Sequence, residues 1–320
     1  MASEELQIMT RHETRQKEQI GRLFTSLLCI TGSSLVGVFM AKLISQSLDI
    51  AFTDFALLAL GSAMILIGAK FDFNNFIFSS GGEHRVNHLF FKIGSSLLVF
   101  LIAIKILAGE TSSYRRSLEE GGIVEWATFL LLLISAYMLF CCAKTVHSGL
   151  FRVIYYILSG ISFVIGMEEM SWGQMIFNWK TPSPLALIND QGETNLHNIG
   201  FISSHSDLAY GLILALIVFV TLAADRQTKQ IKNQNFYTAL LELAPSKMLL
   251  IYFVPASIFS LCLYFNIHEF AHGFILRGEE ELMEMIGAFG LLGYSTSMIS
   301  RFKNMQLNKD TSMHRNIDPG

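Results

Sequence analysis

Eight long apolar runs constrain the fold of this chain more than any other sequence feature. A helix needs about 20 apolar residues to cross the hydrocarbon core of a membrane. Only structures that satisfy every backbone polar group internally can span that core. The sequence therefore predicts an all-α, polytopic membrane helix bundle of about eight transmembrane helices. The runs cover residues 23–44, 53–69, 89–108, 123–143, 152–168, 208–224, 248–267 and 283–300.

The composition supports a membrane protein. Charged residues make up 15% of the 320 residues, whereas soluble domains contain about 25%. The net charge of -3 lacks the basic excess typical of nucleic-acid-binding proteins. Soluble enzymes and nucleic-acid binders are therefore disfavoured.

The positions of the basic residues predict the orientation. Most of the 23 Lys and Arg residues fall in segments on the same side as the N-terminus, and cytoplasmic loops carry the excess of positive charge. We therefore expect both termini to be cytoplasmic. The predicted organisation is a cytoplasmic N-terminal segment (1–22), one transmembrane domain (23–300) and a cytoplasmic tail (301–320). One long polar loop, at about 169–207, is expected on the outer side.

Residues that could carry chemistry collect on this predicted outer side. Some have a simple explanation, because the unpaired N–H groups and the dipole at a helix N-terminus favour carboxylates. Asp207 and the acidic run 279–281 fit that explanation. Glu125 lies one turn deeper in its span, and we keep it as a catalytic candidate.

Glu168 and Glu169 do not fit the same explanation. They end an apolar run at the C-terminal end of a predicted span, where the dipole opposes negative charge. Ionisable groups at membrane depth are functional candidates by default, so both are predicted catalytic residues and Glu169 also a metal ligand. The alternative is a salt bridge to Lys105 or Arg115.

An amphipathic stretch and a dense polar segment follow this pair. Trp172, Phe177 and Trp179 are typical of an aromatic belt at the membrane surface, and Gln174 among them is a further catalytic candidate. In the polar segment 189–198, a helical turn would place Glu193 and His197 on one face, as a joint metal site or as a histidine oriented by a carboxylate. The alternative is a hydrogen-bonded polar loop that plugs the bundle.

The strings EEMSWGQMIFNWKTP and NDQGETNLHN, with GGIVEW before the fourth span, carry a family resemblance. They resemble the signature of a bacterial multi-pass membrane protein family, over about residues 120–200. The resemblance implies a location in the bacterial cytoplasmic (inner) membrane. It implies no particular reaction.

The residues His268-Glu269-Phe270-Ala271-His272 form a literal HExxH motif. On a helix, two His with this spacing can bind zinc while the Glu acts as a general base. His268 and His272 are therefore candidate metal ligands, and a third ligand could come from Glu280, Glu281 or Glu284, although none of these has the usual zincin spacing. A short motif also occurs by chance, and interfacial histidines at a helix end are the alternative.

Three kinds of function remain open. The first is a membrane-embedded, metal-dependent enzyme, a hydrolase or lipid-modifying enzyme, that acts on an amphiphilic or lipid-linked substrate. Glu and His ligands suit zinc, iron or manganese as the divalent metal. The alternatives are an ion-coupled transporter or permease, and a non-catalytic subunit that docks a partner through the 169–207 loop. The expected partner is membrane lipid, with no nucleic acid, and the sequence leaves the oligomeric state open.

Overall fold

A computed structural model describes residues 82–108, 112–119, 121–146, 148–177, 179–189, 191–227, 243–267 and 278–315. Over these residues the chain is helical and contains no β-strand, only one antiparallel bridge between Asn189 and Ile199. The all-α prediction is thus confirmed for this part of the chain. The long helices are α4 (Gly82–Ala108), α6 (Ile123–Thr145), α7 (Gly149–Glu169), α11 (Ser206–Gln227), α13 (Leu250–Tyr264) and α14 (Glu280–Arg315). The short elements are α5 (Ser112–Ser117), η1 (Ser171–Gly173), α8 (Gln174–Phe177), α9 (Ser183–Ala186), α10 (Gly200–Ser203) and η2 (Lys247–Leu249).

Five helical segments in the described residues are long and apolar enough to cross a membrane. They match five of the predicted runs, and they cover Ile123–Thr145, Gly149–Glu169, Ser206–Ala224, Lys247–Tyr264 and Glu280–Lys303. The predicted run 89–108 lies within α4, a helix of 27 residues. The runs 23–44 and 53–69 and the segment 1–22 lie outside the described residues.

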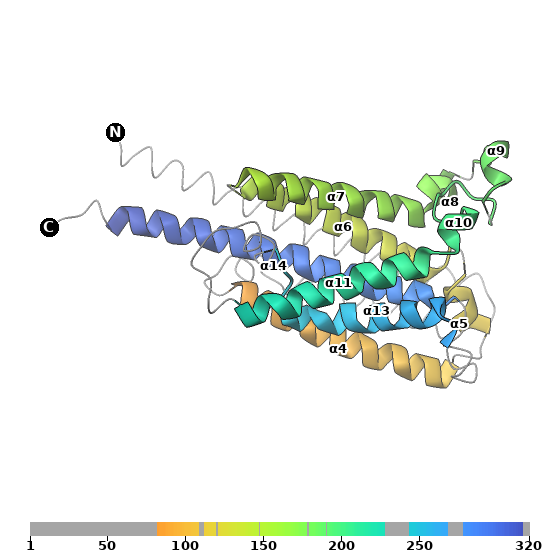
Figure 1. Cartoon of the computed structure of the whole chain (residues 1–320), viewed down its shortest axis with the longest axis horizontal. Coiled ribbons are helices and arrows are strands. Elements are labelled where there is room, and N and C mark those ends of the chain that lie inside the picture. The colour runs from red at the N-terminus through yellow and green to blue at the C-terminus, as the bar shows by residue number, and fades with distance from the viewer. Residues whose placement is uncertain are drawn as a thin grey trace, which may run out of the picture.

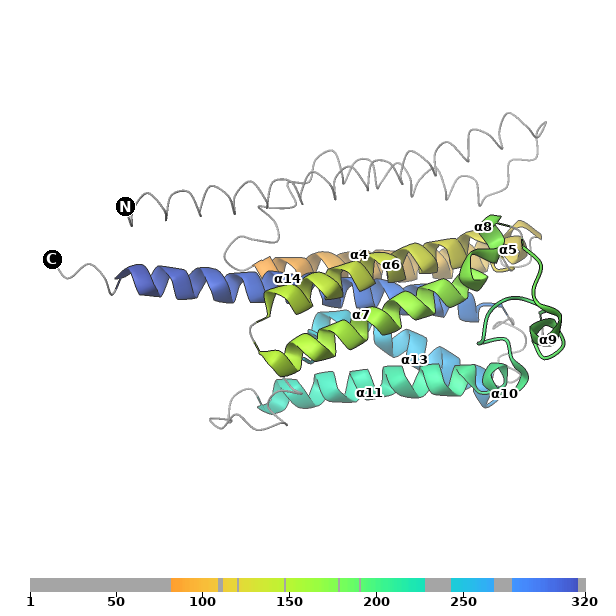
Figure 2. The same cartoon turned by 90° about the horizontal axis from the view of Figure 1, so that it is seen from above.

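The long helices form a bundle with α14 at its centre (Figures 1 and 2). Helix α14 packs against α4, α6 and α13, while α7 packs on α6 and α11 packs on α13. Accordingly α14 is the most buried of the candidate spans, and α7 and α11 are the least buried. Helix α14 is also the longest of the described helices, with 36 residues.

Small residues let the other helices approach α14 closely. A Cβ atom on Gly290 would lie 2.6 Å from Cε1 of Phe253 in α13, and one on Gly287 would lie 2.0 Å from the Tyr210 hydroxyl in α11. Helix contacts of this kind are typical of membrane bundles. The hydrophobic effect does not drive helices together in lipid, and close packing at small residues does so instead. The core on either side of this contact includes Leu139, Leu249 and Ile286, all fully buried.

The outward faces of α7 and α11 are apolar. Exposed side chains include Ile157, Ile161 and Phe163 in α7, and Leu216 and Phe219 in α11. Apolar side chains in these positions are suited to contact with lipid.

The connecting elements α5, α8, α9 and α10 gather at one end of the bundle, which we call the loop end (Figure 2). Helices α6, α11 and α14 begin there, and α4, α7 and α13 end there (Figure 1). The sequence predicts that the polar residues collect on one side of the bundle, and the structure brings the described ones together at this end.

Candidate functional site

Helix α7 ends at the loop end in an unusual turn. Its last residues are Glu168 and Glu169, and three consecutive residues then have positive φ: Ser171 (45°), Trp172 (56°) and Gly173 (92°). Only glycine adopts this left-handed region without strain, so the first two residues hold an unfavourable backbone conformation. Strain of this kind persists where the surrounding contacts fix it. It reverses the chain directly behind the two carboxylates.

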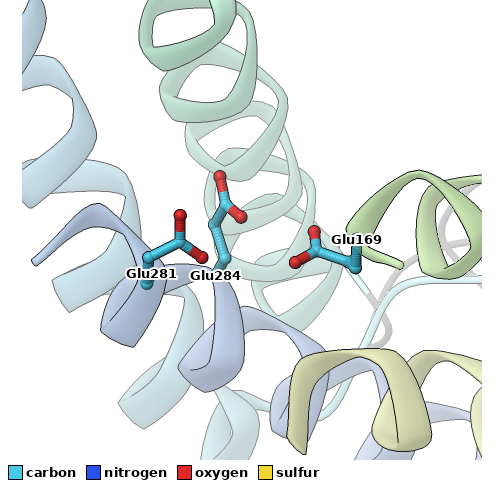
Figure 3. A group of neighbouring side chains, drawn as sticks. All are labelled: Glu169, Glu281 and Glu284. Carbon is cyan, nitrogen blue, oxygen red and sulfur yellow. The ribbon is translucent and has the colours of Figure 1, made fainter. Parts of the chain in front are cut away.

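Three carboxyl groups meet beside this turn. Glu169 comes from the end of α7, and Glu281 and Glu284 come from the first two turns of α14 (Figure 3). One oxygen atom of each lies within 4.8 Å of the others, and none of the three side chains is exposed. Figure 3 shows the carboxyl groups turned toward one another. We call these three residues the carboxylate cluster.

The surroundings of the carboxylate cluster are also acidic. Glu125 interacts electrostatically with Glu169, and Glu280 and Asp207 interact with Glu284. In the described part of the chain neither Glu169 nor Glu284 forms an ion pair with Lys or Arg. The N-terminus of α14 offsets part of this negative charge through its dipole, whereas the C-terminus of α7 adds to it.

The carboxyl groups of Glu169 and Glu284 also lie close enough to form a hydrogen bond when one of them carries a proton. Two carboxyl groups stay this close when they share a proton or when a cation lies between them. Three carboxylate oxygens around one point match the ligands of divalent cations such as Mg²⁺ and Mn²⁺. The arrangement therefore suits either a metal ion or a bound proton.

Tyr210 lies next to the carboxylate cluster. It comes from the second turn of α11, interacts electrostatically with Glu284 and Glu169, and donates its hydroxyl to the carbonyl oxygen of Met283 at 3.2 Å. This hydroxyl is a neutral hydrogen-bond donor beside the carboxylates. It also holds α11 against α14.

Glu168 has a different role from its neighbour. Its carboxylate accepts hydrogen bonds from the backbone N–H groups of Leu196 (2.6 Å) and His197 (3.1 Å) and from the Trp172 indole N–H. Neither Glu168 nor Glu169 pairs with Lys105, which instead pairs with Glu279. Glu168 therefore anchors the polar loop to the end of α7.

The polar loop is held together by its own side chains. Asn189 donates to the carbonyl and side-chain oxygens of Asn195 (both 2.8 Å), and Glu193 accepts from Ser171 (2.6 Å) and Asn195 (2.7 Å). Gln174 accepts from the backbone N–H of Thr194 at 2.8 Å. Residues 193–198 are not helical, so the interpretation that Glu193 begins a helical turn is wrong. The side chain of Asn189 instead captures the backbone N–H groups of residues 191 and 193 (both 3.0 Å) and bends the chain into a loop.

His197 lies between two carboxylates of this network. Its Nδ1 atom is 3.6 Å from Oε2 of Glu168, and Glu193 also interacts with it electrostatically. Partial burial lowers the pKa of His197 below its ordinary value, although both carboxylates act in the opposite direction. Burial thus favours the neutral form of the imidazole in the folded chain.

The structure divides the predicted site residues between two places. Glu169 joins the carboxylate cluster, and Glu125 lies near it while accepting the N–H of Gly121 (2.6 Å) at the start of α6. The residues of the polar loop network are Glu168, Gln174, Glu193 and His197. His268 and His272 lie outside the described residues.

From the sequence, Glu281 and Glu284 are only candidates for an additional ligand, and no role is predicted for Tyr210. A signal for the first two is present in the sequence, because residues three apart share one face of a helix. The acidic run at the start of the last span continues on that face to Glu284. No comparable pattern marks Tyr210, whose position depends on the packing of α11 against α14.

The comparisons with protein families, curated proteins and solved structures found no match for this chain. The resemblance of residues 120–200 to a bacterial membrane protein family therefore stays a prediction.

Proposed function

We propose that this chain is a membrane-embedded enzyme whose divalent metal is bound by Glu169, Glu281 and Glu284. The observation that carries the proposal is the convergence of three carboxyl oxygens within 4.8 Å. Like charges this close, at the end of an apolar bundle, are costly without a compensating cation or proton. A bound cation would remove this cost.

The ligand types favour a hard cation, which prefers oxygen ligands. Carboxylates alone suit Mn²⁺ or Mg²⁺ better than zinc, whereas additional histidine ligands would move the preference toward zinc or iron. Among the described residues the ligands at the carboxylate cluster are all carboxylates. We therefore rank manganese above zinc as the metal of this site.

The position of the carboxylate cluster suggests the class of substrate. It lies at the loop end, beside α7 and α11, whose apolar outer faces suit contact with lipid. A metal at this depth would polarise an ester, amide or phosphate or activate a water molecule against it. An amphiphilic or lipid-linked molecule, with its polar linkage at the membrane surface, fits this arrangement.

The close approach of the Glu169 and Glu284 carboxyl groups also supports a second candidate function. A proton shared by two carboxyl groups is the element that an ion-coupled transporter uses as a relay. In that case the carboxylate cluster would exchange protons with water, and it would bind no metal stoichiometrically.

Metal analysis of the purified protein separates the two proposals. We expect about one equivalent of a divalent metal in the wild-type protein, and a loss of about tenfold or more in metal affinity for Glu284→Gln. The control is Glu119→Gln, which removes an exposed carboxylate just before α6 and should leave the metal unchanged. A wild-type protein that binds neither Mn²⁺, Mg²⁺ nor Zn²⁺ would contradict the enzyme proposal and favour the proton relay.

A further inference from the structure

The segment 174–203, which joins α7 to α11, places its polar and apolar side chains in an unusual way. Two of its polar side chains point inward, Asn195 (1% exposed) and Asn189 (6% exposed), and they form the hydrogen bonds described above. Lys180, Ser183 and Gln191 are exposed. Its large apolar side chains are outside. Leu187 is 86% exposed, Phe201 77% and Phe177 69%.

This amount of exposed apolar side chain is unusual for a loop in water. An aqueous loop exposes its polar groups, and soluble surfaces rarely carry this much apolar area outside binding sites. In segment 174–203 the exposed large apolar residues come from α8 and α10 and from the residues on either side of α9. They include Ile176, Phe177, Trp179, Leu187, Ile188 and Phe201.

The charges and the aromatic residues of the segment also suit a membrane surface. The stretches 181–189 and 198–204 contain no Asp, Glu, Lys or Arg. The rings of Phe177 and Trp179 stack with their centroids 5.5 Å apart, and the Trp179 side chain remains partly exposed. Aromatic rings with a polar edge concentrate where a membrane meets water.

The segment continues directly from surfaces that face lipid. It leaves α7 and enters α11, the two least buried candidate spans, whose outer faces are apolar. The bundle itself therefore holds the segment at the membrane boundary.

We propose that segment 174–203 lies in the membrane interface, with its exposed apolar side chains in contact with lipid and its polar network turned toward the bundle. The expected partner is the headgroup and upper acyl region of the bilayer. This proposal does not depend on the function of the carboxylate cluster. It makes the segment a lipid-facing cover beside Glu169.

Tryptophan fluorescence in lipid vesicles tests the proposal. The Trp126→Phe/Trp172→Phe variant leaves Trp179 as the only tryptophan, and it is reconstituted into phosphatidylcholine vesicles with lipids brominated high on the acyl chain. The matched control adds Trp179→Phe and Arg116→Trp, which moves the reporter to an exposed position in the polar helix α5. We expect quenching of Trp179 by the brominated lipid to be at least about twofold stronger than in the control, and quenching by aqueous acrylamide to be weaker.

Two other results would overturn the proposal. If acrylamide quenches Trp179 as strongly as the reporter in the control, the segment lies in water. If neither agent reaches Trp179, then protein covers the segment, as in a dimer formed through this face.

A second measurement uses the wild-type chain, because Trp172→Phe removes a hydrogen bond to Glu168. Vesicles containing a lipid with a photoreactive diazirine on its upper acyl chain are irradiated, and the modified peptides are mapped by mass spectrometry. Adducts on Leu187 and Phe201, but not on α5, are expected. Adducts confined to the long helices would contradict the proposal.

Discussion

Glu168 and Glu169 are neighbours in the sequence, but their carboxylates bind two different parts of the structure. Glu168 accepts the backbone N–H groups of Leu196 and His197 and so anchors the polar loop. Glu169 meets Glu281 and Glu284 of α14. Successive residues of a helix point about 100° apart, so one pair of acidic residues serves both the loop and the carboxylate cluster. The two carboxylates should therefore respond differently to substitution.

Glu168→Gln should loosen the polar loop. The amide oxygen can replace only part of the carboxylate's acceptor capacity, and hydrogen bonds to a charged group contribute about 1.5–3 kcal/mol each. We expect faster amide hydrogen exchange at Leu196 and His197, and unchanged metal affinity. Glu169→Gln should give the opposite result, with protected amides and reduced metal affinity. Equal effects of the two substitutions on both measurements would show that the carboxylates act as one unit.

Glu284→Gln should change stability in opposite directions with and without metal. In chelator, the substitution removes one of several neighbouring negative charges, and we expect a higher Tm than in the wild-type protein. At a metal concentration about 100 times the Kd, the wild-type protein gains about 2.7 kcal/mol of stability, and the order should reverse. Thermal unfolding in detergent, with EDTA or with Mn²⁺, measures both conditions. A Tm difference that is independent of metal would count against a metal site.

Gly287→Ala should separate α11 from α14. The new Cβ atom would meet the Tyr210 hydroxyl at 2.0 Å, and overpacking of this kind costs about 1–3 kcal/mol. Tyr210→Phe in the same chain should restore most of that loss, because it removes the hydroxyl. Gly160→Ala in α7 is the matched control. Its Cβ atom would lie in open space, so its Tm should stay equal or rise. Equal losses for the two alanine variants would contradict this account of the helix contact.

The stability of the polar loop should depend on pH through His197. Burial lowers the pKa of His197 in the folded chain, so the unfolded chain binds the proton more readily. The contribution of His197 to the free energy of unfolding is therefore fully present above about pH 6.5, the pKa of histidine in the unfolded chain. It decreases as the pH falls below that pKa. Unfolding followed between pH 8 and pH 5, which are about 1.5 units on either side of that value, should show a smaller decrease for His197→Gln than for the wild-type protein. Parallel curves would show that other groups cause the dependence.

The predicted orientation places the loop end outside the cytoplasm. A thiol reagent that cannot cross the membrane should label Arg116→Cys in α5 and should not label Ser148→Cys between α6 and α7. Both residues are exposed, and they lie at opposite ends of the bundle. The parent chain gives the background from its own cysteines. The reverse pattern would place the loop end in the cytoplasm.

The sequence predicts the helices better than it predicts the site. Apolar length alone locates five candidate spans, because in a membrane the hydrogen-bonding requirement leaves few alternatives to a helix. The structure extends α14 to Glu280, three residues before the predicted run begins at 283. Its first turn is polar, and the carboxylate of Glu280 accepts the N–H of Gly278 (2.6 Å) at the helix start.

The local sequence around Glu168 and Glu169 predicts only part of what the structure shows for these two residues. The helix dipole marks both residues as unusual, but it does not show what each one contacts. The partner of Glu169 is more than 100 positions away in the chain, and the contact depends on how α7 and α14 pack. The shape of the polar loop depends on Asn189 and Asn195 in the same way, through hydrogen bonds that periodicity does not predict.

The length of α14 has a mechanical consequence. At 1.5 Å per residue, its 36 residues form a rod about 54 Å long, well beyond a hydrocarbon core of about 30 Å. Glu281 and Glu284 lie at one extremity of this rod, and the opposite extremity projects past the bundle (Figure 1). A tilt of about 10° at the carboxylate cluster would displace the distant tip by about 9 Å, if the helix stays straight. A displacement of α14 at the loop end would therefore move its far end, beyond the rest of the bundle, by a larger distance.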